Sequence, residues 1–313
     1  MNINHNIRVL KDATKWFLKN LKYRLKLRPG RAAQNDVLFF VFEPGVKHPG
    51  LADRFKAAVA LYNHCKKCGY QFKMYYETPF RLADYMAPKQ DWEFKLEDLE
   101  YSLQDTKIIT EQNLWPLPTL KKGKQYHVYA YAGNSLPRVF EDTGYKWSEL
   151  FQELFEPSAL LQKAFNALQM PPAGTYISVH LRFVNALETF ENGFFDNRLK
   201  TQAERDLLVK RCHKGLIELQ EQNPYTDIFV FSDSKVFLDS LEGLPVRVLS
   251  HDSIGHVSEG ANEAAQLKSF LDLYAISRSK EVWRFLAPEL YNWSCYAMVA
   301  AYMEDVPFKE KQV

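Results

Sequence analysis

The sequence predicts an α/β protein with two parallel-sheet domains behind a basic N-terminal helix. The chain has 313 residues, roughly two average domains in length. Strand-length apolar runs alternate with helix-length amphipathic stretches in both halves, which favours parallel sheets. Nine basic residues against one acid gather between residues 8 and 31. We therefore expect a basic amphipathic segment over 1–34 and α/β domains over 35–169 and 170–313.

The basic segment alternates Lys and Arg with large apolar side chains, among them Trp16 and Phe17. A basic amphipathic helix of this kind is typical of an anionic membrane surface, reached through residues 8–28. Basic segments also bind phosphate backbones, but we expect no nucleic acid partner. The other interpretation is a helix docked on its own domain.

Apolar runs in this sequence are too short to cross a bilayer, and the N-terminus lacks the apolar core of a secretory signal. The four cysteines are too few for a disulfide framework, and Cys65 and Cys68 fit an ordinary helix better than a zinc site. We expect a cytoplasmic protein, peripheral on the inner face of the membrane.

The first domain opens with a continuous apolar run, 36–42, typical of a strand buried on both faces. A loop with two Pro-Gly pairs leads to an amphipathic helix that ends near Gly69. Strands are expected at 71–76 and 126–132, separated by a loop-rich stretch, and helices over 147–168. The stretch 170–174 is the expected linker.

The second domain repeats the alternation. We predict strands at 175–181, 227–232, 245–250 and 281–285, and helices at 202–221, 235–241, 261–277 and 294–303. Polar residues gather where three strands end: His180 with Arg182, Ser232 with Asp233, and Ser294 at the start of the last helix. Because ligands bind at the carboxyl ends of parallel strands, and because an Arg fork and a helix N-terminus suit a diphosphate, we expect an anion site there.

Each of these residues also has a structural interpretation. His180 and Arg182 would fit the polar side of a solvated edge strand, and Asp233 and Ser294 would fit helix caps. The motifs of dinucleotide-binding folds, P-loop proteins and zinc proteases are absent from the sequence, as are Asp-x-Asp pairs near strand ends. We therefore expect no metal ion and no cofactor.

Three stretches resemble the motif regions of the GT-B fucosyltransferases, the superfamily of protein O-fucosyltransferases, α-1,6-fucosyltransferases and the nodulation fucosyltransferase. They are "HPGLADRFKAAVALYNHCKKCGY", "ISVHLRF" and "LDLYAISRSKEVW" with the following "NWSCYAMVAA". The resemblance spans most of residues 36–305. It implies two Rossmann-like domains that face a cleft, and transfer from GDP-fucose to a glycan, with inversion and without metal.

The resemblance also implies roles for individual residues. Arg182 would hold the β-phosphate, with His180 near the nucleotide, and Ser232 and Asp233 lie in the region that contacts guanosine. Ser294 would receive the phosphates, and Tyr296 stands where the family often has Phe.

Inverting transfer requires a general base on the acceptor side. The resemblance places the cleft at the loop from Glu43 to Arg54, which also contains Gly50. Glu43, directly after the first strand, is the first candidate for the base and Asp53 the second. Asp53 would equally complement a helix dipole. Arg54 would contact the donor or the acceptor, or form a helix-surface ion pair. Glu188 or Asp196, and a mechanism without a base, remain open.

The sequence therefore predicts a glycosyltransferase, a fucosyltransferase of surface polysaccharide biosynthesis. A GT-B transferase that uses another nucleotide sugar is one alternative, and a non-catalytic nucleotide- or glycan-binding protein is the other.

Overall fold

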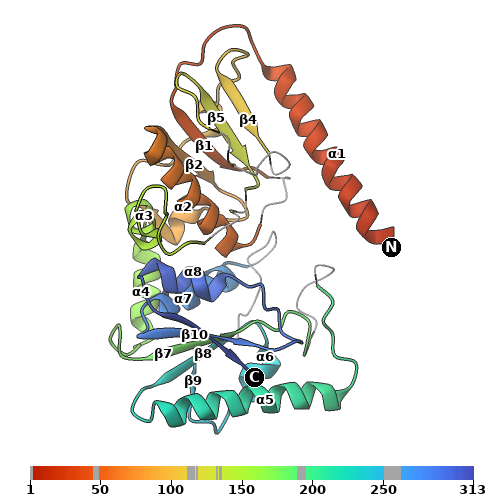
Figure 1. Ribbon diagram of the computed structural model, residues 1–313, viewed down its shortest axis with the longest axis vertical. Coiled ribbons are helices and arrows are strands. Elements are labelled where there is room, and N and C mark those ends of the chain that lie inside the picture. Colours follow the sequence, from red (N-terminus) through yellow and green to blue (C-terminus); the bar gives the residue numbers. More distant parts are fainter. Residues whose placement is uncertain are drawn as a thin grey trace. The chain divides into compact units, whose positions relative to one another are not determined.

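A computed structural model describes residues 3–44, 49–110, 117, 119–131, 133, 136–188, 195–249 and 262–313 (Figure 1). The chain divides into two compact units. Unit 1 comprises Met1–Leu82 and Pro88–Tyr145, and unit 2 comprises Ala83–Ala87 and Lys146–Val313.

Unit 1 contains a parallel sheet in the order β2-β1-β5-β4. Its elements are α1 (Ile3–Lys26), β1 (Val37–Phe42), α2 (Leu51–Cys68), β2 (Gln71–Tyr76), the 3-10 turns η1 (Leu82–Asp84, which continues into unit 2) and η2 (Leu96–Asp98), β4 (Thr106–Ile109) and β5 (Gln125–Tyr129). β3 (Met86–Pro88) lies where the chain passes between the units.

β1 is buried along its whole length, because both faces of the sheet are covered. Val37, Phe39 and Val41 pack in one cluster with Trp16 and Tyr23 of α1. Helix α2 follows β1 and ends at Gly69, whose left-handed backbone (φ 66°) needs a residue without a Cβ atom. The continuous apolar run of the sequence thus corresponds to a central strand of the sheet.

Helix α1 docks on unit 1 through the C-terminal half of its length. Trp16 and Tyr23 are buried there, and the Tyr23 hydroxyl hydrogen-bonds Nδ1 of His127 on β5. Nε2 of His127 in turn lies 2.5 Å from Oε1 of Gln125. Burial, with the nearby charge of Lys19, lowers the pKa of His127 to about 3, so the ring is neutral. The interpretation of a helix docked on its own domain is therefore confirmed for this face.

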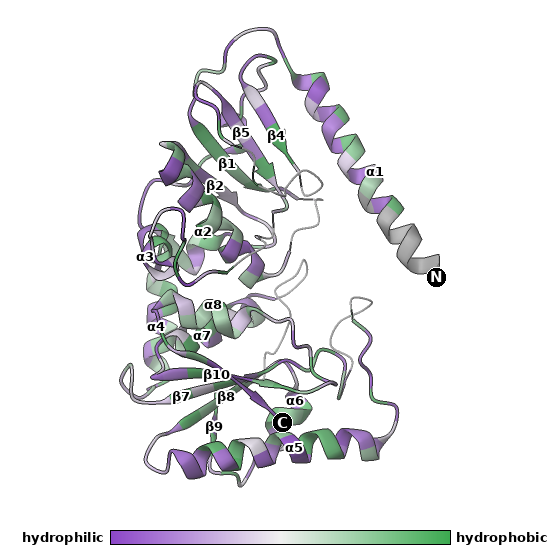
Figure 2. Cartoon of the chain, in the orientation of Figure 1, coloured by the Kyte–Doolittle hydropathy of each residue, from purple (hydrophilic) through white to green (hydrophobic). Residues whose placement is uncertain are grey.

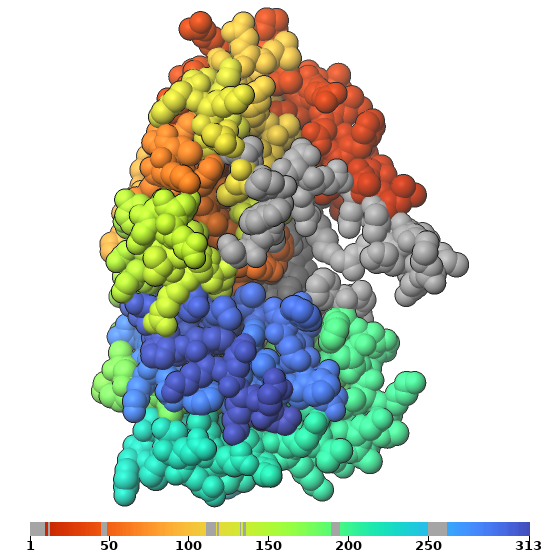
Figure 3. Space-filling view, viewed as in Figure 1, coloured from red at the N-terminus to blue at the C-terminus, as the bar shows by residue number. Residues whose placement is uncertain are grey.

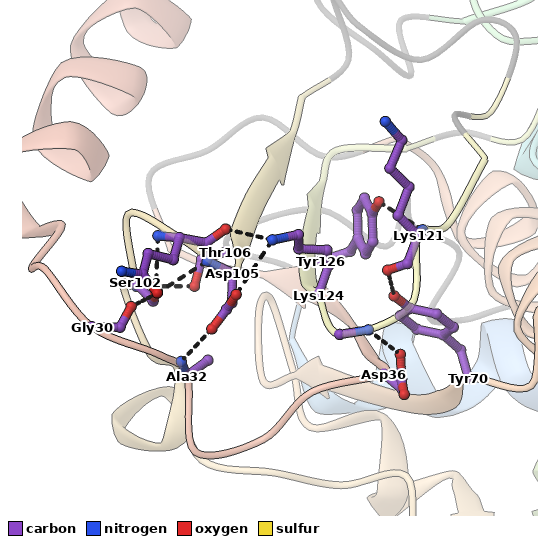
Figure 4. Close-up of polar contacts among 12 residues, drawn as sticks. Gly30, Ala32, Asp36, Tyr70, Ser102, Asp105, Thr106, Lys121, Lys124 and Tyr126 are labelled. Carbon is purple, nitrogen blue, oxygen red and sulfur yellow. Dashed lines mark hydrogen bonds and ion pairs between the residues drawn. The ribbon is translucent and has the colours of Figure 1, made fainter.

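The amino ends of the unit 1 strands are closed by side-chain hydrogen bonds (Figure 4). Asp105 accepts from the amide of Ala32 at 3.2 Å and pairs with Lys124 at 3.3 Å. Asp36 accepts from the amide of Gly123 at 2.8 Å, and the Tyr126 hydroxyl accepts from the amide of Lys121 at 3.0 Å. These polar groups are thus hydrogen-bonded or paired within unit 1 itself.

Unit 2 contains a parallel sheet in the order β11-β10-β7-β8-β9. Its elements are α3 (Trp147–Leu154), β6 (Phe155–Pro157), α4 (Ala159–Ala167), β7 (Ile177–Leu181), α5 (Gln202–Gln222), β8 (Ile228–Ser232), α6 (Lys235–Asp239), β9 (Arg247–Val248), α7 (Glu263–Ser277), β10 (Glu281–Leu286), α8 (Tyr296–Met303) and β11 (Phe308–Gln312). β3 and β6 form a separate two-stranded sheet.

The unit 2 sheet lies between helices. α5 and α6 cover one face, with their apolar side chains packed against β7 and β8, and α7 and α8 lie on the other face (Figures 1 and 2). β7 is the middle strand, so His180 lies in a buried strand and not at a solvated edge, and Arg182 directly follows that strand.

Several sequence predictions differ from the structure. The chain divides near residue 145 and not at 169, because α3 and α4 pack on unit 2: Trp147 contacts Tyr302, and Phe165 contacts Tyr274. β3, β4, β6 and β11 were not predicted, because the first three are only three or four residues long and β11 is mostly charged and polar. Helix α8 begins at Tyr296 with Cys295 at its N-cap, two residues later than predicted.

Within the part of the chain that the structure describes, every helix is too short or too polar to cross a membrane.

Candidate functional site

The order of the unit 2 strands marks where a ligand should bind. The chain runs from β7 outward to β8 and β9, and then returns to the other side of β7 to form β10 and β11. The strand order therefore reverses between β7 and β10. In open α/β sheets, ligands bind at the carboxyl ends beside such a reversal. His180 and Arg182 end one of these two strands, and Ser294 and Tyr296 follow the other.

His180 is buried, and one of its ring nitrogens has no hydrogen-bond partner among the described residues. Its ring packs against Tyr296, with centroids 5.4 Å apart. Burial, with the charges of Arg182 and Arg284, lowers the pKa of His180 to about 3, so the imidazole is neutral. Among the described residues, no group hydrogen-bonds its Nδ1. Since buried polar atoms normally have partners, this nitrogen is suited to a ligand.

Arg182 lies at the end of β7 in a loop with strained backbone. Its Nη1 is 3.3 Å from Oδ2 of Asp233, and its side chain remains one-fifth exposed. Two residues later Val184 adopts φ 55°, a conformation that costs a β-branched residue energy. The Asp233 carboxylate stabilises this loop by accepting from the amides of Phe183 (2.7 Å) and Val184 (2.8 Å). The guanidinium of Arg182 is therefore held in position at the carboxyl end of β7.

Asp233 and its neighbours thus act mainly on the protein. Both carboxylate oxygens of Asp233 are occupied and the residue is buried. Glu188 accepts from the Ser234 hydroxyl at 2.8 Å and from the amide of Val236 at 3.2 Å, where α6 begins. The Ser232 hydroxyl accepts from the amide of Ser234 at 3.2 Å and stays partly exposed.

Ser294 and Tyr296 form the other wall of the site, at the start of α8. The Ser294 hydroxyl accepts from the amide of Tyr296 at 3.4 Å, so it lies just before the N-cap. The Tyr296 hydroxyl donates to the carbonyl of Ser269 on α7. Burial raises the pKa of this hydroxyl well above its usual range, so Tyr296 acts as a neutral, fixed ring. The first amides of α8 have no partners within the helix and favour an anion.

Two elements of this site were not predicted from the sequence. Arg284 lies beside His180 in the register of β10 and β7, and its Nη1 donates to the carbonyl of Ser294 at 2.5 Å. Lys268 and Asp272, one turn apart on α7, form a bidentate ion pair with 2.5 and 2.6 Å separations near Tyr296. The one available signal for Arg284 was a charged residue between the apolar residues Trp283 and Phe285 of the strand.

Unit 1 has the same kind of reversal, between β1 and β5. The chain runs from β1 to β2 on one side, and later places β5 on the other side of β1. Glu43 directly follows β1 at this reversal, and its carboxylate forms an ion pair with Lys19 of α1. The ammonium of Lys19 also lies 4.3 Å from the ring centroid of Tyr129, the last residue of β5. Burial, with the charges of Lys22 and Lys26, lowers the pKa of Lys19 to about 8.

The other predicted residues of unit 1 lie at the start of α2. Gly50 is the N-cap, and Asp53 pairs with Lys56 at 2.7 Å in the first turn. Arg54 is buried and donates to the carbonyls of Pro49 and Thr78, at 2.7 and 2.8 Å. Its guanidinium also stacks on Phe42 and Tyr76. Arg54 is therefore a brace between two loops, in place of the helix-surface ion pair considered from the sequence.

Asp196 is exposed and pairs with Arg198 at 2.9 Å, which lowers the pKa of its carboxyl group. Among the described residues, no three His, Cys, Asp or Glu side chains gather in a way that could hold a metal ion.

No protein-family model and no curated protein matches the sequence. The fold, however, is similar to solved fucosyltransferases. The NodZ α-1,6-fucosyltransferase soaked with GDP-fucose is 14% identical with a TM-score of 0.54, over 86% of this chain and 93% of that one. A Bradyrhizobium NodZ structure gives the same identity and TM-score over 86% and 92%. Arabidopsis thaliana FUT1 with GDP is 9% identical, with a TM-score of 0.55 over 93% and 73%. The predicted GT-B fucosyltransferase fold is confirmed.

Proposed function

We propose that this chain is a metal-independent, inverting glycosyltransferase that transfers fucose from GDP-fucose to a glycan acceptor. The observation that carries the proposal is the strand reversal of unit 2, where Arg182, the unused Nδ1 of His180 and the start of α8 lie at the carboxyl ends of β7 and β10. Solved structures of the same fold contain GDP-fucose or GDP, which makes a GDP-sugar the first candidate ligand.

The diphosphate would bind to Arg182 and the N-terminus of α8. Arg182 suits the β-phosphate, because a guanidinium offers several donors in a plane and Asp233 holds it in position. Ser294 would receive the phosphates beside the positive end of α8. Asp233 would act through Arg182, and Ser232 would contribute its hydroxyl toward the guanosine.

The nucleoside would lie against His180 and Tyr296. The neutral imidazole can donate or accept at Nδ1, and no described residue competes for that atom. Tyr296 fixes the ring of His180 from one side.

Transfer would proceed by a single displacement. Glu43 takes the proton of the acceptor hydroxyl, the hydroxyl oxygen bonds to the anomeric carbon of fucose, and the bond from that carbon to the β-phosphate oxygen breaks. Attack opposite the leaving group inverts the anomeric carbon. Arg182 and α8 hold the charge that develops on GDP, which replaces the role of a metal. Asp53 is the second candidate for the base, and Gly50 and Arg54 shape the loop that receives the acceptor.

The proposal extends to the place of the enzyme in the cell. A cytoplasmic location, with peripheral attachment to an anionic membrane through residues 8–28, fits the exposed lysines of α1. Each Lys or Arg near such a surface contributes about 1 kcal/mol of attraction. The enzyme would then contribute to the biosynthesis of a surface polysaccharide.

Calorimetric titration with GDP, GDP-fucose, UDP and UDP-glucose tests this function. We expect binding of the two guanine nucleotides and no heat from the uridine nucleotides. Tight binding of UDP-glucose would point to another nucleotide sugar. Binding of GDP-fucose without release of free fucose or transfer to any glycan would point to a non-catalytic binding protein.

A further inference from the structure

Helix α1 exposes an apolar stripe on the side away from its docked face. Five large side chains on it are 43–79% exposed: Leu10, Phe17, Leu18, Leu21 and Leu25. At 100° per residue they fall within an arc of about 100°, while Trp16 and Tyr23 project roughly opposite. The helix forms an exposed flank of unit 1 (Figure 3). A soluble surface rarely exposes so many large apolar residues without a partner.

The charges beside this stripe identify the partner. On the helical wheel, Lys11 and Lys22 border one edge of the stripe and Arg24 borders the other, and all three are exposed. An apolar strip between two cationic borders complements an anionic lipid surface, where the apolar side chains enter the acyl boundary and the cations meet headgroups. A second copy of the chain would bring the same cations together and is disfavoured.

The opposite side of α1 packs on unit 1 and contacts the predicted base. Trp16 and Tyr23 are buried in the core of unit 1, Tyr23 hydrogen-bonds His127, and Lys19 pairs with Glu43. Lys19 lies between Phe17 and Leu21 in sequence. Glu43 therefore contacts α1 at the same level as these two residues of the stripe, but on the opposite side of the helix. A helix with its side chains is about 10–12 Å thick. A bilayer on the stripe therefore lies about one helix diameter from Glu43.

We propose that the acceptor is a lipid-linked glycan, and that the sugar closest to the lipid receives the transferred residue. The inference rests on the proposed function, because it uses Glu43 as the acceptor-side base. The apolar face of such a helix enters the headgroup boundary by about 5–10 Å. A hydroxyl at Glu43 must then lie just outside the headgroups, which a membrane-anchored glycan provides and a distal part of a long soluble glycan does not.

The test uses the full-length protein with radiolabelled GDP-fucose and either the membrane fraction or the soluble fraction of the cells that make it. We expect the label in lipid extracted from the membrane fraction by chloroform and methanol. Label in soluble glycan or in protein would overturn the inference while leaving the transferase function intact. Membranes that accept no label from an enzyme that releases free fucose from GDP-fucose would also overturn it, whereas an enzyme that binds GDP-fucose and neither releases nor transfers fucose would refute the proposed function. An enzyme that binds neither GDP nor GDP-fucose would instead refute the proposed function itself.

A matched pair of variants separates the stripe from general surface effects. Phe17→Gln with Leu21→Gln should reduce binding to phosphatidylglycerol vesicles and labelling of membrane lipid by at least about tenfold, because both substitutions replace an apolar side chain of the stripe with a polar one. Leu160→Gln with Leu207→Gln, at exposed positions of unit 2, should change neither. GDP affinity should stay the same in all of them. If the stripe variant labels membrane lipid as fast as the wild type, or if the stripe instead joins two copies of the chain, the inference is wrong.

Discussion

The ammonium of Lys19 in α1 forms an ion pair with the carboxylate of Glu43 at the end of β1. This contact joins the element predicted to meet the membrane with the residue predicted to activate the acceptor. Glu43 remains partly exposed, because about one-quarter of its side chain is open to solvent. Glu43 lies at the strand reversal of unit 1, which makes it the first candidate for the base.

Glu43→Gln should reduce the rate of transfer by roughly 10²- to 10⁴-fold, the usual contribution of a positioned base. The amide keeps the shape of the side chain but cannot take a proton. GDP-fucose affinity, measured by calorimetry, should not change. Asp53→Asn is the matched control, and a large loss there with near-normal turnover in Glu43→Gln would transfer the role to Asp53.

Arg182→Ala should weaken GDP binding by about 1.5–3 kcal/mol, the worth of a charged hydrogen bond. Arg182→Lys should not restore affinity, because an ammonium cannot present two parallel donors and would hold Asp233 differently. Calorimetry with GDP measures both. The control is Arg198→Ala, an exposed arginine of unit 2 that pairs with Asp196. Wild-type affinity in Arg182→Ala would exclude it from the phosphate site.

Acid should destabilise both units through buried histidines. His127 and His180 have a pKa of about 3 in the folded chain, against an ordinary value of 6.5. Between these pH values the unfolded chain binds protons that the folded chain does not, so stability falls as pH decreases below 6.5. The slope is about 1.4 kcal/mol per pH unit for each histidine.

Urea unfolding at several pH values between about 7 and 5 checks this slope. His127→Gln should remove one such contribution and His180→Gln the other, whatever their effect on stability at neutral pH. A pH dependence equal to that of the wild type in both variants would contradict the assignment of neutral, buried imidazoles.

Two neighbouring residues of α1 should contribute very differently to the free energy of unfolding. Trp16→Ala should lower the free energy of unfolding by about 3 kcal/mol or more, because a buried indole leaves a cavity. Phe17→Ala should change it by less than about 0.5 kcal/mol, since that ring is 66% exposed. Thermal unfolding and vesicle sedimentation of both variants provide the measurements.

A version starting near residue 34 would uncover Phe39 and Val41, so it should be less stable than the full chain.

Chelation should leave transfer unchanged. Arg182 and the start of α8 would supply the positive charge that GDP needs as it departs. We expect equal initial rates with EDTA and with added magnesium or manganese, measured as release of GDP. A rate that collapses in EDTA and returns with a divalent ion would show that a metal takes part in the reaction.

Several elements could be predicted from local patterns. The unbroken apolar run before Glu43 identified a strand buried on both faces, and it is the central β1. Gly69 identified the end of α2, because only a residue without Cβ adopts that backbone easily. The alternation of strands and helices predicted two parallel sheets. These properties depend on residues a few positions apart, so the sequence determined them by itself.

Other properties depended on partners far away in the sequence. Trp16 and Phe17 look alike as neighbours on a basic helix, yet one is buried and the other exposed, because only the sheet of unit 1 decides which face of α1 is covered. From the sequence, Asp233 could be a ligand-binding residue or a helix cap. In the structure its carboxylate accepts hydrogen bonds from two amides of the loop after β7, so it stabilises that loop. Arg284 became a neighbour of His180 through the register of two strands that are a hundred residues apart. The sequence by itself thus determined where strands end and which polar residues follow them. Only the tertiary structure decided which of these polar groups are hydrogen-bonded within the protein, since each such pairing depends on long-range packing.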